Sequence, residues 1–104
     1  MVSYIEVDSP ENLDEAIDEM TDFSDDINTI IDEVENNKNE DVDEVLKDLK
    51  SEGLELNCDE NEEELSCKYR FRGEVIEAEF TINIEVEGRE IKGYEPGKVR
   101  ITIK

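Results

Sequence analysis

The stretch LELNCDENEEELSCKYRF, residues 54–71, decides the fold of this 104-residue chain. Apolar and polar residues alternate on both sides of its acidic centre, and a period of two is typical of β-strands. Folding the stretch about Glu62 and Glu63 gives one antiparallel register with an apolar face and a polar face. That register pairs Leu54 with Phe71, Leu56 with Tyr69, Cys58 with Cys67, Glu55 with Arg70 and Asn57 with Lys68. The stretch therefore predicts a β-hairpin that buries one side.

Further strands are expected on both sides of this hairpin. After a turn at Arg72 and Gly73, a long strand is predicted with six inward positions: Ile76, Ala78, Phe80, Ile82, Ile84 and Val86. Pro96-Gly97 suits the central positions of a type II turn, so we expect an irregular segment over residues 89–97. A last strand should carry Val99, Ile101 and Ile103 inward. Residues 2–7 are predicted to form a short strand that could pair at an edge of the sheet.

A long helix is predicted over about residues 10–36. Ser9-Pro10-Glu11 is typical of an N-cap followed by a first helical turn. Asp22 or Ser24 could cap a second helix, but the apolar stripe keeps its phase past them, which favours one helix. The stripe recurs at steps of three and four: Leu13, Ala16, Ile17, Met20, Phe23, Ile27, Ile30, Ile31 and Val34. We expect it to pack on the sheet rather than to form a coiled-coil dimer.

A shorter helix over about residues 40–51, ended near Gly53, completes a helical hairpin. Together these elements predict a single α+β domain spanning residues 1–104. The helical hairpin should pack on one face of a mostly antiparallel sheet, a meander of about four strands.

The sequence lacks the motifs of several common classes of enzyme and of phosphate-binding sites. It contains no histidine, no Gly-x-Ser-x-Gly setting and no glycine-rich loop before a helix, so we expect no enzyme and no cofactor. Residues 37–41 resemble the start of an EF-hand loop, but Val42 stands where that loop needs glycine, so no metal site is expected. Cys58 and Cys67 are interpreted as reduced thiols that pack as small apolar residues, with a cross-strand disulfide as the alternative.

Charge is the most distinctive functional feature of the chain. Residues 1–66 contain 25 acids and three lysines, whereas residues 67–104 contain seven acids and eight bases. On a helical wheel, nine acids of the first helix fall opposite the apolar stripe and form the candidate partner-binding site: Glu11, Asp14, Glu15, Asp18, Asp22, Asp25, Asp26, Asp32 and Glu33. They span about 33 Å of helix, or one charge per ~3.7 Å, against ~3.4 Å per phosphate along a strand of B-DNA.

Such a face indicates a basic protein as the partner. The first hypothesis is a nucleic-acid mimic that occupies the basic groove of a DNA- or RNA-binding protein. Acidic helices over an antiparallel meander resemble, in architecture and charge alone, the acidic DNA-mimic inhibitors. The alternatives are a generic adaptor for another basic protein and a structural domain whose charge serves solubility.

The same charge bears on other partners and on location. A net charge of −21 predicts no direct binding to nucleic acid and repulsion from anionic membranes. The N-terminus has no basic region followed by an apolar region, so a cytoplasmic protein is expected. A monomer is favoured over a homodimer.

Overall fold

The computed structural model describes residues 13–104, which form two helices and one four-stranded antiparallel sheet. The elements are α1 (Leu13–Asn36), α2 (Val42–Ser51), β1 (Leu56–Glu60), β2 (Glu64–Arg72), β3 (Ile76–Glu87) and β4 (Glu90–Ile103). Strands that follow each other in sequence are neighbours in the sheet, so the predicted α+β fold with a four-stranded meander is confirmed. The predicted strand over residues 2–7 and the cap at Ser9-Pro10-Glu11 lie outside the described residues.

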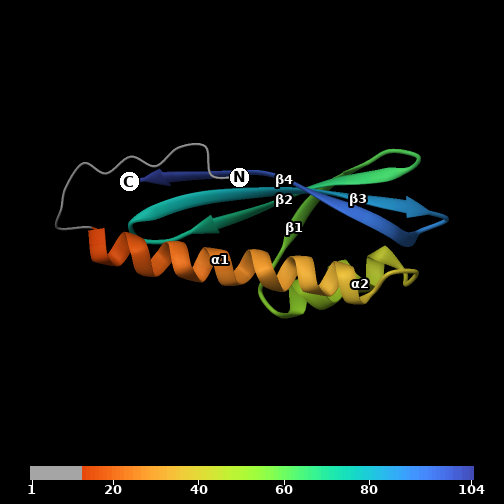
Figure 1. The fold of residues 1–104 in the computed structure, drawn as a ribbon, viewed down its shortest axis with the longest axis horizontal. Coiled ribbons are helices and arrows are strands. Elements are labelled where there is room, and N and C mark those ends of the chain that lie inside the picture. The colour runs from red at the N-terminus through yellow and green to blue at the C-terminus, as the bar shows by residue number, and fades with distance from the viewer. Residues whose placement is uncertain (1–12) are drawn as a thin grey trace.

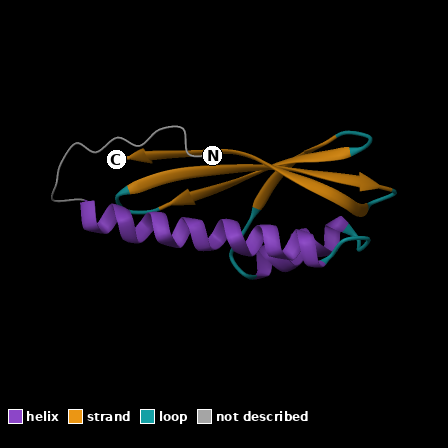
Figure 2. Ribbon diagram, viewed as in Figure 1, coloured by secondary structure: helices purple, strands orange, loops and turns teal. Residues whose placement is uncertain are grey.

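Both helices lie on the same face of the sheet (Figures 1 and 2). The long helix α1 runs along the sheet, and α2 lies beside its C-terminal half (Figure 1). The other face of the sheet carries no helix among residues 13–104. None of the described helices is both long enough and apolar enough to cross a membrane.

The segment that carries the apolar stripe forms one continuous helix, α1, as predicted, without a break at Asp22 or Ser24. Its fully buried members are Ala16, Phe23, Ile30 and Val34. The prediction is wrong at the start of the stripe, because Leu13 is 41% exposed and Ile17 is 49% exposed. Ile17 follows buried Ala16 by one residue, which turns its side chain about 100° around the helix and away from the sheet.

The helix α2 ends in hydrogen bonds that explain where β1 begins. Gly53 adopts a φ of +86°, and its N–H donates to the carbonyl of Lys50. The N–H of Leu54 donates to the carbonyl of Leu49, which completes a Schellman motif. Because Leu54 is held by the helix end, β1 starts only at Leu56.

The predicted register of the first hairpin is confirmed over the residues that β1 contains. Leu56 pairs with Tyr69, Asn57 with Lys68 and Cys58 with Cys67. The predicted pairs that involve Leu54 and Glu55 are absent from the ladder, since both residues precede β1.

The second hairpin differs from its prediction in the position of the turn. Gly88 and Arg89, with φ values of +58° and +72°, form a two-residue turn between β3 and β4. Positive φ at both central residues is the property of the type I′ turn, whose twist matches that of the flanking strands. The predicted turn at Pro96-Gly97 is wrong, and Pro96 lies inside β4 opposite Ile82.

The predicted irregular segment over residues 89–97 is also wrong, because β4 is continuous from Glu90 to Ile103. Two register shifts, between Phe80 and Ile82 and between Glu85 and Val86, interrupt its pairing with β3. Each shift changes which residues of β4 face inward. Between the two shifts, Tyr94 and Pro96 lie opposite the inward residues Ile84 and Ile82, while Ile91 and Ile101 are buried on either side of them.

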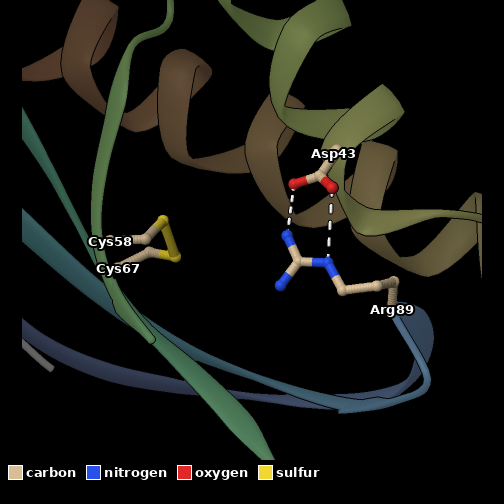
Figure 3. Close-up of a disulfide and its surroundings, with 4 residues drawn as sticks. All are labelled: Asp43, Cys58, Cys67 and Arg89. Carbon is tan, nitrogen blue, oxygen red and sulfur yellow. Dashed lines mark hydrogen bonds and ion pairs between the residues drawn. A yellow bond between two sulfur atoms is a disulfide. The ribbon is translucent and has the colours of Figure 1, made fainter. Parts of the chain in front are cut away.

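Cys58 and Cys67 form a disulfide between β1 and β2 (Figure 3). The interpretation as reduced thiols is therefore wrong, although the predicted pairing of the two positions is correct. Cys67 is buried and Cys58 is half-buried on the face that the helices cover. The bond links the edge strand β1 to the rest of the sheet.

The double variant Cys58→Ser/Cys67→Ser is expected to lower the free energy of unfolding by about 2–3 kcal/mol. The cross-link joins residues nine positions apart and restricts the unfolded chain, and a loop of that size corresponds to this magnitude. Urea unfolding of the oxidised wild type, the reduced wild type and the variant measures it. Reduced wild type should lie between the other two, because thiols still pack as apolar groups. Three coincident unfolding curves would contradict the prediction.

Candidate partner-binding surface

Six of the nine predicted acids are exposed on the side of α1 that faces away from the sheet. We call this set the acidic face, and it consists of Asp14, Glu15, Asp18, Asp22, Asp25 and Asp32. None of these side chains makes a hydrogen bond or an ion pair with any part of residues 13–104. Their charges are available to a partner.

No ion pair stabilises the helix through these charges, and only Asp14 and Glu15, in its first turn, lie where the helix dipole favours an acid. Described residues of α1 include ten acids and no base, so no ion pair forms within the helix. Asp14, Asp18 and Asp22 follow each other at steps of four, a spacing at which like charges repel by a few tenths of a kcal/mol per pair, about 0.2–0.5. The buried stripe on the opposite side must hold the helix in place.

The other three predicted site residues do not belong to this face. Glu11 lies outside the described residues. Asp26 is half-buried, and its Oδ2 accepts a hydrogen bond of 2.6 Å from the hydroxyl of Tyr69. Glu33 is half-buried too, and its Oε2 lies 3.4 Å from Nδ2 of Asn37. The prediction that all nine acids lie opposite the stripe is wrong for Asp26 and Glu33, because both lie on the flank of the helix.

The contact with Asp26 changes the acidity of Tyr69. Burial raises the pKa of the Tyr69 phenol, and the hydrogen bond to Asp26 and the charge of its carboxylate raise it further. The phenol therefore stays protonated and continues to donate to Asp26 well above pH 10. Asp26 serves as an anchor between α1 and β2 rather than as a free charge.

Glu19 has a structural role that the sequence did not reveal. Its carboxylate accepts three backbone hydrogen bonds of 2.9 Å each, from the N–H groups of Glu74, Val75 and Ile76 in the turn between β2 and β3. A Cβ atom at Gly73 would lie 2.1 Å from Oε1 of Glu19, so glycine is needed for this approach. No local pattern marks Glu19, because its partners lie more than 50 residues away.

The backbone donors also set the ionisation of Glu19. Burial raises the pKa of its carboxyl, but the three N–H groups and the positive charge of Lys104 outweigh burial and bring the pKa below its usual range. A carboxyl with a lowered pKa in the folded state stabilises the fold at pH values above its unfolded pKa. That contribution is lost as the pH falls through the lowered value.

We expect Glu19→Gln to lower the free energy of unfolding at pH 7 by about 1 kcal/mol, since the amide removes the charge and offers a donor to the N–H of Glu74. Glu15→Gln, on the exposed side of the same helix, is the matched control and should change little. Urea unfolding at pH 7 and near pH 2.5 measures the difference, which should shrink at the lower pH as the wild-type carboxyl becomes protonated.

Gly73→Ala tests the same contact from the opposite side. The added methyl group should displace the Glu19 carboxylate, so Gly73→Ala and Glu19→Gln should cost clearly less together than the sum of their separate effects. Additive costs would show that the two residues act independently and would contradict this role of Glu19.

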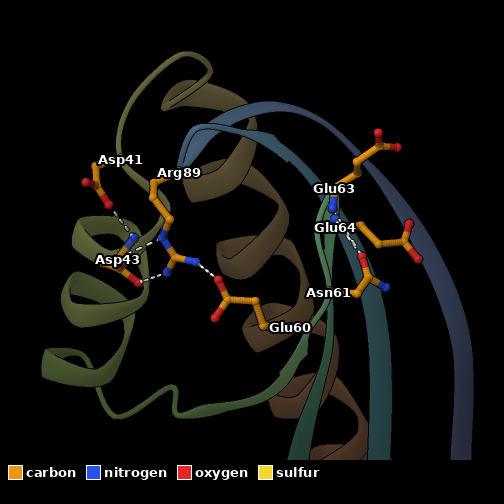
Figure 4. A network of polar contacts seen from close by, with 7 residues as sticks. All are labelled: Asp41, Asp43, Glu60, Asn61, Glu63, Glu64 and Arg89. Carbon is orange, nitrogen blue, oxygen red and sulfur yellow. Dashed lines mark hydrogen bonds and ion pairs between the residues drawn. The ribbon is translucent and has the colours of Figure 1, made fainter.

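A polar network joins α2, β1 and the second hairpin turn at the far end of the sheet (Figure 4). Arg89 forms ion pairs with Asp43 of α2 and Glu60 of β1, and its Nε lies 3.3 Å from Oδ2 of Asp43. Asn61 Oδ1 accepts hydrogen bonds from the N–H groups of Glu63 and Glu64, which fixes the acidic turn between β1 and β2. These contacts explain the local structure without a bound ion.

The many carboxylates of the chain do not form a metal site in the part that the structure describes. Among the described residues, no three side chains of histidine, cysteine, aspartate or glutamate come together as a metal site would require. The acids of the acidic face are spread along α1 instead. Their arrangement suits contact with an extended basic surface better than coordination of a single ion.

The linear charge density of the acidic face is lower than the sequence predicted. From Asp14 to Asp32 the helix rises about 27 Å, so six free carboxylates give one charge per ~4.5 Å, counted in the same way as for the nine predicted acids. B-DNA carries one phosphate per ~3.4 Å on each strand. The close numerical match to DNA therefore depended on residues that the fold uses elsewhere or that lie outside the described part.

In the comparisons with known proteins, the chain matches no protein-family model, no curated protein and no solved structure.

Proposed function

We propose that this is a non-enzymatic binding protein whose acidic face docks onto a basic surface of another protein. The observation that carries this proposal is a row of carboxylates without partners along one side of α1. A helix that gained from its surface charges would pair them with bases. This helix tolerates repulsion instead, which is expected where the charges serve a partner.

The favoured partner surface is the nucleic-acid groove of a DNA- or RNA-binding protein. Such grooves present lysine and arginine side chains along an extended track, and charge complementarity speeds the encounter and fixes the orientation. The length of the acidic face, about 27 Å, corresponds to roughly eight phosphates along one strand. The protein would then act as an inhibitor by occupying the groove.

A generic adaptor that binds another basic protein is the second candidate. The wider spacing of the free carboxylates, about 4.5 Å per charge, supports it, since a groove shaped for DNA would meet a denser row of phosphates. Both candidates share the acidic face and differ in what the partner's surface normally binds.

Competition separates the two candidates. The protein is immobilised, a host lysate is passed over it, and bound proteins are eluted by a salt gradient and purified. Binding of each purified partner is then measured with and without its own nucleic acid. Loss of binding supports the mimic, while simultaneous binding of the protein and nucleic acid supports the adaptor. If nothing elutes that depends on the acidic face, the proposal fails and the charge serves solubility.

A further inference from the structure

Bases gather at one end of the outer face of the sheet, in a chain that is otherwise strongly acidic. On β2, Lys68, Arg70 and Arg72 alternate with the inward residues of the strand. In β4, Arg100 and Thr102 stand on either side of the inward residue Ile101, so both lie on this outer face. Four of the eleven bases of the whole chain therefore share this surface, opposite the helices.

The register places three arginines around one hollow. Arg70, Glu79 and Arg100 lie side by side across β2, β3 and β4, and Arg72, Glu77 and Thr102 form the next row. These six residues line a hollow of about 300 Å³. That volume is at the lower end of the range for small-molecule sites, which runs from about 300 to 1,000 Å³.

The carboxylates beside the hollow do not neutralise it. Oε1 of Glu79 lies 3.1 Å from Nε of Arg70, and Glu77 lies 3.8 Å from Nζ of Lys104. The guanidinium groups of Arg72 and Arg100 have no hydrogen bond or ion pair with the residues that the structure describes. In a chain with 32 acids and 11 bases, two arginines without partners at one hollow are unexpected.

The geometry points to a binding site for a small molecule that carries two or more oxyanion groups, held by Arg72 and Arg100. A guanidinium group presents two parallel N–H donors that match a carboxylate or a phosphate. The two arginines stand on the strands on either side of β3, about 10–12 Å apart at their Cα atoms, so both forks can reach one ligand between them. The hydroxyl of Thr102 adds a donor at the same hollow.

The charge distribution limits the ligand to a small one. A polyanion such as nucleic acid or an acidic protein would extend beyond the hollow, where a protein with a net charge of −21 repels it. Repulsion between two copies of this chain disfavours self-association through this face for the same reason. A small oxyanion remains within about 8 Å, the screening length at physiological salt, of the arginines.

The test is a titration of the ¹⁵N-labelled protein with sodium pyrophosphate and, separately, with sodium citrate at constant ionic strength. Chemical shifts should change in β2, β3 and β4 around the hollow. A response to pyrophosphate alone identifies phosphate as the ligand group, a response to citrate alone identifies carboxylate, and a response to both supports the shared chemistry. The absence of localised changes with either anion would overturn the proposal.

Two variants and a matched control make the site assignment specific. Arg72→Ala/Arg100→Ala should weaken binding at least about 10-fold, because two charged hydrogen-bonding groups are lost. Lys47→Ala/Lys50→Ala removes the same charge from exposed positions on α2 and should change affinity little. Glu79→Gln should strengthen binding, since it releases Arg70. Equal losses in the two double variants, or no gain in Glu79→Gln, would contradict a site at this hollow.

Discussion

Phe23→Ala is expected to lower the free energy of unfolding by about 3–5 kcal/mol, a larger loss than for any other substitution predicted for this protein. Phe23 is 2% exposed and lies at the centre of the face that α1 packs on the sheet. Its ring centroid is 6.2 Å from that of Tyr69 and 5.8 Å from that of Phe71. The substitution removes these contacts and leaves a cavity between the helix and β2.

The same substitution should disturb the anchor beside it. Asp26 stands three residues after Phe23 and holds the hydroxyl of the Tyr69 ring against which Phe23 packs. Loss of Phe23 therefore removes the ring contact with Tyr69 and weakens the hydrogen bond between Tyr69 and Asp26, two of the contacts that join this part of α1 to β2. Urea unfolding monitored by circular dichroism gives the loss of stability directly.

Ile17→Ala is the matched control on the same helix. The helical apolar stripe alone would give Ile17 the same importance as Phe23, but an exposure of 49% for Ile17 predicts a cost below about 1 kcal/mol. If Phe23→Ala is too unstable to leave enough folded protein for the measurement, Phe23→Leu should still cost about 1 kcal/mol. Similar costs for Phe23→Ala and Ile17→Ala would show that α1 packs with a different face.

Local patterns predicted the elements that depend on local physics. A period of 3.6 predicted α1, and the alternation around Cys58 and Cys67 predicted the register of the first hairpin. In that hairpin the apolar pattern and the charge pattern agree, and a shift by one residue would move every side chain to the wrong face. Agreement between two independent patterns made this part of the sheet predictable.

The second hairpin could not be predicted in the same way. Pro96-Gly97 is a strong local turn signal, yet the chain turns at Gly88-Arg89, where positive φ at both residues suits a tight hairpin. Two register shifts then allow Pro96 to lie inside β4. A strand with such shifts has no constant alternation, so its sequence alone looks irregular.

The sequence predicted that the candidate site is acidic, but it did not predict which of the acids are free. The helical wheel identified the exposed side of α1, where Asp14, Asp18, Asp22, Asp25 and Asp32 lie. It could not identify the roles of Glu19 and Asp26, because those depend on which strand lies beside the flank of the helix. A carboxylate on a flank becomes structural only when the fold brings a donor to it.

Replacing Asp18, Asp22 and Asp25 together by Asn is expected to weaken binding to the captured partner by about 1–3 kcal/mol, or roughly 5- to 150-fold. The estimate assigns each exposed charge pair about 0.2–1 kcal/mol. These three carboxylates lie at the middle of the acidic face and have no partner in the described part of the chain. The substitution keeps the size of each side chain and removes only its charge.

The stability of the fold should change in the opposite direction. Asp18 and Asp22 stand four residues apart, and Asp25 follows after three, so the substitution relieves repulsion along the helix. The free energy of unfolding should stay constant or rise by a few tenths of a kcal/mol, about 0.2–0.5 per relieved pair. Weaker binding together with unchanged or greater stability separates a contact at the acidic face from a loss of folded protein.

A control with the same change in net charge decides whether the position of the charges matters. Glu62, Glu87 and Glu95 are exposed and lie away from α1, so replacing all three by Gln lowers the negative charge equally. If the acidic face is the contact surface, this control should retain most of the affinity and lose little of its salt dependence. If both triple variants lose affinity equally, net charge alone attracts the partner, and the acidic face is not the binding site.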